Sequence, residues 1–97
     1  MVIWTEPAKA DLHHIYAFIA ENSKQYARKV VREMVEKTDI LDEVPKVGKV
    51  VPEIQNDNVR ELHLYSYRIL YEIKAPNVDV LAVIHKRRDF NGEEIGK

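Results

Sequence analysis

The first third of the chain has the hydrophobic spacing of two amphipathic helices. In the first, apolar side chains recur at the i, i+3, i+4 and i+7 positions that share one helix face: Leu12, Ile15, Tyr16 and Ile19. Thr5 suits the N-cap position ahead of this stripe. Glu6-Pro7 suits the first turn, because a carboxylate complements the helix dipole and proline is tolerated there. Residues 1–4 are expected to form a short strand that leads into this helix.

A second helix is predicted from about residue 24 to residue 41. Asn22-Ser23 interrupts the first pattern, and Ser23 can cap the next helix. The new stripe consists of Ala27, Val30, Val31, Met34, Thr38 and Leu41. Because only a short connection separates the two stripes, the helices should form an antiparallel hairpin.

The remainder of the chain predicts a loop followed by strands. Residues 42–58 lose the helical pattern and contain Pro45, Gly48 and Pro52, so they should form a loop with at most one short extended piece. β-Branched and aromatic residues then predict strands over residues 59–64, 67–74 and 78–86. The order β-α-α-β-β-β indicates an α+β domain, with the helical hairpin packed on one face of a small antiparallel sheet.

The predicted turns sort the strand residues onto two faces of the sheet. A short turn at Tyr65-Ser66 and a four-residue turn at 74–77 pair Leu62 with Ile69 and Ile69 with Ala82. One face is then almost wholly apolar and should carry the helices. The other face is mixed and carries Glu61, His63, Arg68, Leu70, Glu72, Asp79, Leu81, Val83, His85 and Arg87. Its apolar centre has no helix left to cover it, which is typical of a partner-binding surface.

Composition narrows the class of protein. The chain has 97 residues, expected to form the single domain 1–97, with 45% hydrophobic and 32% charged residues. It has no cysteine, which excludes a disulfide scaffold and thiolate chemistry. No apolar run has the length of a membrane span and no signal-peptide pattern is present, so we expect a cytoplasmic protein. The formal net charge of −1 disfavours a strongly basic nucleic-acid binder but leaves room for a local basic patch.

Three groups of residues suggest chemistry, and each has a purely structural alternative. The segment His85-Lys86-Arg87-Arg88-Asp89-Phe90 could bind phosphate or be a solvated strand end. Arg68 could stabilise a phosphate in a reaction or form an ion pair with Glu61 or Glu72. A basic flank of the second helix could touch nucleic acid or simply face solvent: Lys24, Arg28, Lys29 and Arg32. Adjacent His13 and His14 do not share a helix face, and no other histidine lies at a metal-ligand spacing, so no metal site is expected. Gly48 is isolated from any glycine-rich phosphate loop, so no nucleotide cofactor is expected.

Six short segments resemble motifs of the RelE/ParE superfamily of toxins from bacterial type II toxin–antitoxin systems. In chain order they are Trp4-Thr5-Glu6-Pro7-Ala8-Lys9-Ala10-Asp11-Leu12, Ile15-Tyr16-Ala17-Phe18-Ile19-Ala20, Val44-Pro45-Lys46-Val47-Gly48-Lys49, Arg60-Glu61-Leu62, Tyr67-Arg68-Ile69-Leu70-Tyr71 and Val83-Ile84-His85-Lys86-Arg87-Arg88-Asp89. Their order and spacing resemble the ParE-like branch, whose members include plasmid stabilisation proteins. The family's strand and helix order agrees with the pattern described above.

The resemblance implies a toxin that a cognate antitoxin holds inactive in a hetero-oligomer. ParE-like members poison DNA gyrase, whereas RelE-like members act on the ribosome as mRNA endoribonucleases. For a nuclease, the resemblance implies Arg68, His85 and Arg87 as catalytic residues. The terminal tyrosine of many nuclease members is replaced by Phe90, and the basic character of those members is missing. These differences favour a gyrase inhibitor over an enzyme.

The antitoxin is expected to bury apolar anchors on uncovered surfaces of the toxin. One predicted contact is Trp4, near a sheet edge. The others are on the mixed face: its apolar centre, formed by Leu70, Leu81 and Val83, and the cation Arg88 at its border. Acidic antitoxin side chains should meet the arginines, and the helix pair offers a groove as a second surface.

Overall fold

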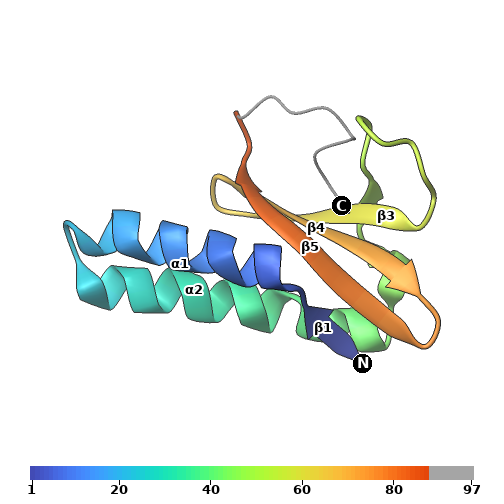
Figure 1. Ribbon diagram of the computed structural model, residues 1–97, viewed down its shortest axis with the longest axis horizontal. Helices are drawn as coiled ribbons and strands as arrows, with labels where there is room; N and C mark the ends of the chain where they lie inside the picture. Colours follow the sequence, from blue (N-terminus) through green and yellow to red (C-terminus); the bar gives the residue numbers. More distant parts are fainter. Residues whose placement is uncertain (88–97) are drawn as a thin grey trace.

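The computed structural model describes residues 1–87 and confirms an α+β fold, with a helical hairpin packed against a sheet (Figure 1). In chain order the elements are β1 (Val2–Trp4), α1 (Glu6–Ala20), α2 (Lys24–Lys37), two 3-10 turns (Asp39–Asp42 and Pro45–Val47), β2 (Lys49–Val50), β3 (Val59–Leu64), β4 (Tyr67–Lys74) and β5 (Asn77–His85). The five strands lie in the order β1-β5-β4-β3-β2. No helix of the described part is long and apolar enough to cross a membrane.

The sheet is mixed rather than antiparallel throughout. Strands β2 to β5 pair antiparallel as expected, but β1 pairs in parallel with β5, so that Val2 lies opposite Val78 and Trp4 opposite Val80. Parallel neighbours require a long connection, and here the connection between β1 and β5 contains both helices and strands β2 to β4. The two-residue strand β2 is the short extended piece within the predicted loop.

Side-chain caps begin both helices where the sequence predicts. The Thr5 hydroxyl accepts a hydrogen bond from the Ala8 N–H, and the Ser23 hydroxyl accepts one from the Tyr26 N–H. Helix α2 ends at Lys37, four residues earlier than its apolar stripe suggests. The Thr38 hydroxyl and N–H both donate to the Val35 carbonyl, which tightens the chain into the 3-10 turn that follows.

Two apolar clusters hold the layers together. The larger lies between the hairpin and the sheet and contains Ala8, Ile15, Val30, Met34, Leu41, Leu62, Ile69, Tyr71, Val78, Val80 and Val83. The smaller lies on the opposite sheet face and contains Val51, Val59, Leu70, Ala82 and Ile84, with Ile54 and Leu81 packed against it. The second face is therefore partly covered, by the loop that follows β2.

A bulge in β5 changes which residues share a face. The predicted register holds from the β4–β5 turn to the pair Tyr71–Val80, after which Leu81 is an additional residue and Ile69 pairs with Val83. The expected pairing of Ile69 with Ala82 is wrong, and beyond the bulge every side chain of β5 moves to the other face. The N-cap of α1 and a residue within α1 bind β5 on either side of the bulge: the Thr5 hydroxyl donates to the Val80 carbonyl, and Asp11 accepts the Val83 N–H at 2.8 Å.

Candidate functional site

Arg68 lies at the centre of an ion-pair cluster on the sheet face opposite the helices. Its guanidinium donates to both carboxylate oxygens of Glu61, at 3.0 and 2.7 Å, and to both oxygens of Glu53, at 2.8 Å each. Arg68 and Glu61 are only 7% and 5% exposed. Of the two structural partners that the sequence suggests for Arg68, Glu61 is correct, and Glu53 from the predicted loop was missed. Nothing in the local sequence pattern indicates that the loop folds back over this strand.

The cluster keeps both carboxylates ionised. Burial raises the pKa of Glu61, but hydrogen bonds from Arg68 and His63 outweigh it and leave that pKa below its ordinary value. The hydrogen bonds from Arg68 also lower the pKa of Glu53. His63 contacts Glu61 through Nε2. Lys49 and Lys86 border the same surface depression. The site therefore consists of the buried Arg68–Glu61 ion pair, whose hydrogen bonds are made within the fold, with two lysines at its border.

Two of the three residues expected to act together in a nuclease, Arg68 and His85, lie on opposite faces of the sheet. Because of the bulge, Arg68 pairs with Ile84, and His85 pairs with Tyr67 on the other face. The rings of Tyr67 and His85 make an edge-on contact with their centroids 5.7 Å apart. The expectation that His85 shares a face with Arg68 is therefore wrong. Arg87 follows the strand end, where its N–H donates to Nδ1 of His85.

The expected apolar partner surface is largely buried. Leu70 is 0% exposed and lies in the cluster that Val51 and Ile54 help to form. Val83 is 4% exposed and belongs to the core beneath the helices. The prediction that these two side chains lie uncovered is wrong, first because the loop folds over Leu70 and second because the bulge moves Val83.

Of the other expected partner contacts, Leu81 and Trp4 lie in the described region. Leu81 is only partly buried on the second face. Trp4 lies on the edge strand β1, and its side chain packs against the core on the helix side. Its indole Nε1 is buried without a hydrogen-bond partner within residues 1–87. Arg88 lies outside the described residues.

A tyrosine hydroxyl and an arginine fix the segment that precedes β2, and the arginine also binds Asp57 in the loop that follows it. Tyr71 donates to the Pro45 carbonyl at 2.6 Å and accepts the Gly48 N–H at 3.0 Å. Arg60 donates to the carbonyls of Lys46 and Gly48 and to Asp57. The sequence pattern assigned Tyr71 to the apolar face but gave no sign that its hydroxyl binds the loop.

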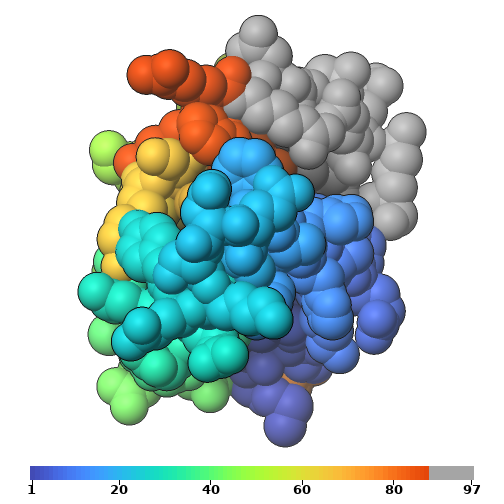
Figure 2. Space-filling view, turned by 90° about the vertical axis from the view of Figure 1, so that its left-hand side faces the viewer, coloured from blue at the N-terminus to red at the C-terminus, as the bar shows by residue number. Residues whose placement is uncertain are grey.

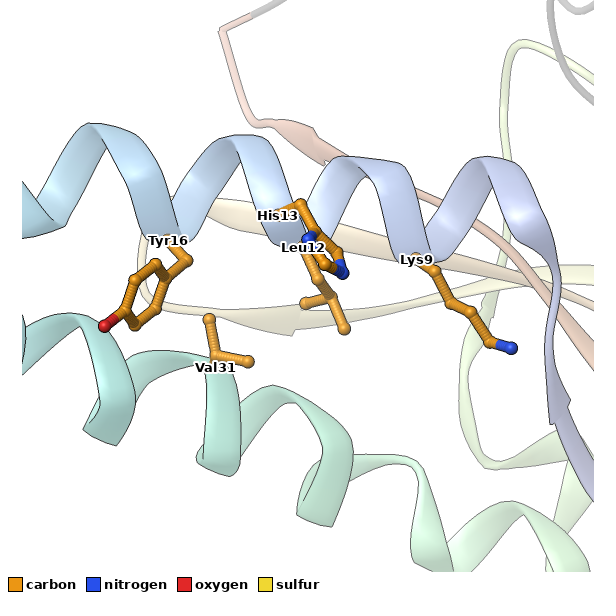
Figure 3. Close-up of a pocket in the computed structure, with 5 residues that line it drawn as sticks. All are labelled: Lys9, Leu12, His13, Tyr16 and Val31. Carbon is orange, nitrogen blue, oxygen red and sulfur yellow. The ribbon is translucent and has the colours of Figure 1, made fainter.

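A groove runs between the two helices on the side of the hairpin away from the sheet (Figure 3). Lys9, Leu12, His13 and Tyr16 line it from α1, and Val31 lines it from α2. The sequence predicted a groove but assigned Leu12, Tyr16 and Val31 to the core. All three are only partly buried, because the two helices splay enough to leave an apolar strip between them. This strip has the shape and polarity of a docking site for an amphipathic segment.

Comparisons with known proteins agree with this fold. The model of the family described as ParE toxin of type II toxin-antitoxin system, parDE, matches residues 2–90. A solved structure described as the chromosomal ParDE TA system from P. aeruginosa is similar, with a TM-score of 0.72 and 26% sequence identity. The similarity covers 87% of this chain and 92% of that one. A search of curated proteins found no match.

Proposed function

This chain belongs to the ParE toxin family of type II toxin–antitoxin systems, and on that premise we propose that it is a DNA gyrase poison. It is the toxin component of such a system, so its partner is an antitoxin. In the proposed mechanism the toxin acts by binding rather than by turnover. It stabilises the state in which gyrase has cleaved DNA, and the antitoxin prevents this contact. The proposal is also consistent with the sequence motifs of the ParE-like branch.

The burial and ion pairing of Arg68 are the observation that favours gyrase over mRNA as the target. An endoribonuclease that uses the RNA 2′-hydroxyl needs a base, an acid and a cation around one phosphate. Arg68 is instead buried, and its guanidinium donates hydrogen bonds to both carboxylates, those of Glu53 and Glu61. His85 lies on the other sheet face. Arg68 and His85 therefore lie on opposite faces of the sheet and cannot flank one phosphate. This geometry supports a toxin that acts without cleaving RNA.

A cleavage assay with purified gyrase tests the target. We expect the toxin to inhibit supercoiling and to cause linear DNA to accumulate, and the purified antitoxin to reverse both effects. The parallel experiment adds the toxin to a translation extract and maps the ends of the mRNA. Site-specific mRNA cleavage without gyrase inhibition would reject the gyrase proposal.

The groove between α1 and α2 is the proposed docking site for the antitoxin. Leu12, Tyr16 and Val31 present apolar surface to a partner, and Lys9 lies at the border where an acidic side chain can pair with it. An amphipathic antitoxin segment would bury its apolar side chains in this strip. Anchors in the desolvated centre of an interface contribute most of the affinity, whereas border charges mainly set rate and specificity.

Substitutions on the two candidate surfaces distinguish where the antitoxin binds. Val31→Asp should weaken antitoxin binding by at least about 100-fold, because burying an unpaired carboxylate costs several kcal/mol. Leu81→Asp tests the second sheet face in the same way. Lys46→Ala is the control, because its side chain is 65% exposed and a surface charge contributes roughly 0–1 kcal/mol. The groove proposal fails if a folded Val31→Asp toxin binds the antitoxin as tightly as the parent.

A further inference from the structure

Helix α2 concentrates positive charge at its N-terminal end, in a chain whose formal net charge is −1. Its first nine residues include four cations, which we call the α2 basic face: Lys24, Arg28, Lys29 and Arg32. The helix has no acidic residue in its first turn, although a carboxylate there would complement the helix dipole. Lys24 with Arg28, and Arg28 with Arg32, are also like charges spaced four residues apart, which destabilises a helix. The only ion pair that these cations form within residues 1–87 is the exposed one between Arg32 and Glu36, so the fold gains little from the arrangement, which suggests a role in binding.

The cations of the α2 basic face are available to a ligand. In the described part of the chain, Lys24, Arg28 and Lys29 take part in no ion pair, and Arg32 meets only Glu36, at 3.8 Å with both side chains more than 60% exposed. Such an exposed pair is weak and easily replaced. Glu33 lies on the same helix but contacts the Tyr65 hydroxyl. By contrast, Arg60 and Arg68 are engaged within the fold, where they donate to backbone carbonyls and to carboxylates.

The surface beside two of these cations, Lys29 and Arg32, is an open hollow rather than an enclosed pocket. Ser23, Gln25, Tyr26, Lys29 and Arg32 line a shallow, open hollow, and they share no residue with the proposed antitoxin groove. Tyr26 is 47% exposed and offers an aromatic ring next to the charges. The end of the hairpin projects beyond the sheet (Figure 1), and Figure 2 views this end directly.

We propose that the α2 basic face binds the sugar-phosphate backbone of DNA. Duplex DNA carries one negative charge per ~1.7 Å of its axis, and arginine matches phosphate with a two-pronged fork of donors. An exposed tyrosine beside such cations can stack on an unpaired base. The inference deepens the proposed function, on which it rests in part, because DNA is a component of the gyrase complex that a poison stabilises. The toxin would touch DNA through α2 while other surfaces touch the enzyme.

The inference is tested by measuring direct binding of the toxin to DNA in the absence of gyrase. The probe is a fluorescently labelled 25-base-pair duplex, and binding is followed by anisotropy between 50 and 200 mM salt. The logarithm of the association constant should fall linearly with the logarithm of the salt concentration, by about 0.9 per phosphate contacted. Lys29→Gln/Arg32→Gln should reduce this slope by about 1.8 and weaken binding roughly tenfold or more at 50 mM salt. The matched control, Lys46→Gln/Lys74→Gln, removes two exposed cations elsewhere and should leave the slope within about 0.5 of the parent.

The outcomes separate this inference from the gyrase proposal. A parent toxin that binds no duplex at 50 mM salt overturns the inference, as does an equal loss in both double variants. A loss of antitoxin binding by Lys29→Gln/Arg32→Gln with unchanged DNA binding also overturns it, because the face would then serve an acidic protein segment. If the parent binds DNA through α2 but leaves gyrase uninhibited, the inference stands and the gyrase proposal fails. Each variant must show a cooperative melt. If the double variant does not, the single variants Lys29→Gln and Arg32→Gln replace it, and each should reduce the slope by about 0.9.

Discussion

Replacing Arg68 with alanine should be among the most damaging single changes to the fold. Arg68→Ala removes both hydrogen bonds to Glu61 and leaves that carboxylate, only 5% exposed, without its main counter-charge. Breaking a buried ion pair in this way costs about 3–5 kcal/mol. The bonds to Glu53 add little to this loss, because the Glu53 side chain is 30% exposed and can regain water. A domain of this size is stable by roughly 5–15 kcal/mol, so the variant should fold but unfold far more easily.

The same substitution should reverse the response of stability to acid. In the parent, the pKa values of Glu53 and Glu61 are below their ordinary values, so their contribution is present near neutral pH and is lost as the pH falls through the lowered values. In Arg68→Ala, the burial that raises the pKa of Glu61 is no longer outweighed by the arginine. The variant should therefore lose stability as the pH rises through this raised pKa, and the difference between the two proteins should shrink on acidification.

Urea unfolding of both proteins at pH 7 and pH 5 measures the two effects. Arg32→Ala is the control, because Arg32 is 64% exposed and its loss should cost roughly 0–1 kcal/mol at either pH. Glu61→Gln in the Arg68→Ala background should recover part of the stability at pH 7, since it removes the unpaired buried charge. A loss below 1 kcal/mol for Arg68→Ala, with the same pH dependence as the parent, would refute the buried-pair argument.

Three further changes test how the loop and α1 are held. Gly48→Ala should cost about 1–3 kcal/mol, since a Cβ there would lie 2.5 Å from the Glu61 carbonyl oxygen and 2.6 Å from the Tyr71 hydroxyl; a melting temperature equal to that of the parent would contradict this. Tyr71→Phe should cost about 1–3 kcal/mol by urea unfolding, because it leaves the Gly48 N–H and the Pro45 carbonyl without their partner; an unchanged midpoint would show that water replaces the hydroxyl. Thr5→Ala should cost about 1–2 kcal/mol by the same measurement, through loss of the α1 cap and of the bond to the Val80 carbonyl; Thr5→Ser, which keeps the hydroxyl, should recover most of it.

Local sequence patterns were sufficient to predict the helices and the three long strands. The apolar spacing, the two caps and the β-branched runs act over a few residues, so they can be recognised without knowledge of the tertiary structure. Strands β3 and β4 have the bounds that the sequence predicts, and the pairing of His63 with Arg68 is confirmed. These pairs follow from one short turn, which fixes the register of both strands.

Tertiary contacts determined the features that the sequence could not predict. The bulge at Leu81 is flanked by long-range contacts, because Thr5 and Asp11 bind the β5 backbone on either side of it from more than 70 positions away in the chain. One additional residue then placed Val83 in the core and separated His85 from Arg68. In the same way, nothing local to residues 51–55 indicates that Val51 packs over Leu70 or that Glu53 reaches Arg68.

The positions of the motif residues explain why the resemblance predicts the fold better than the target. Gly48, Arg60 and Tyr71 meet where the loop is fixed to the sheet, Glu61 and Arg68 form the buried pair beside it, and Asp11 binds β5 next to the bulge. These residues are engaged in holding the chain together, so they carry little information about what the protein binds. Target choice should instead depend on exposed residues whose changes leave the fold intact, such as those of the α1–α2 groove and the α2 basic face. Substitutions there should alter partner binding at nearly constant stability, whereas substitutions at the motif positions should lower stability and activity together.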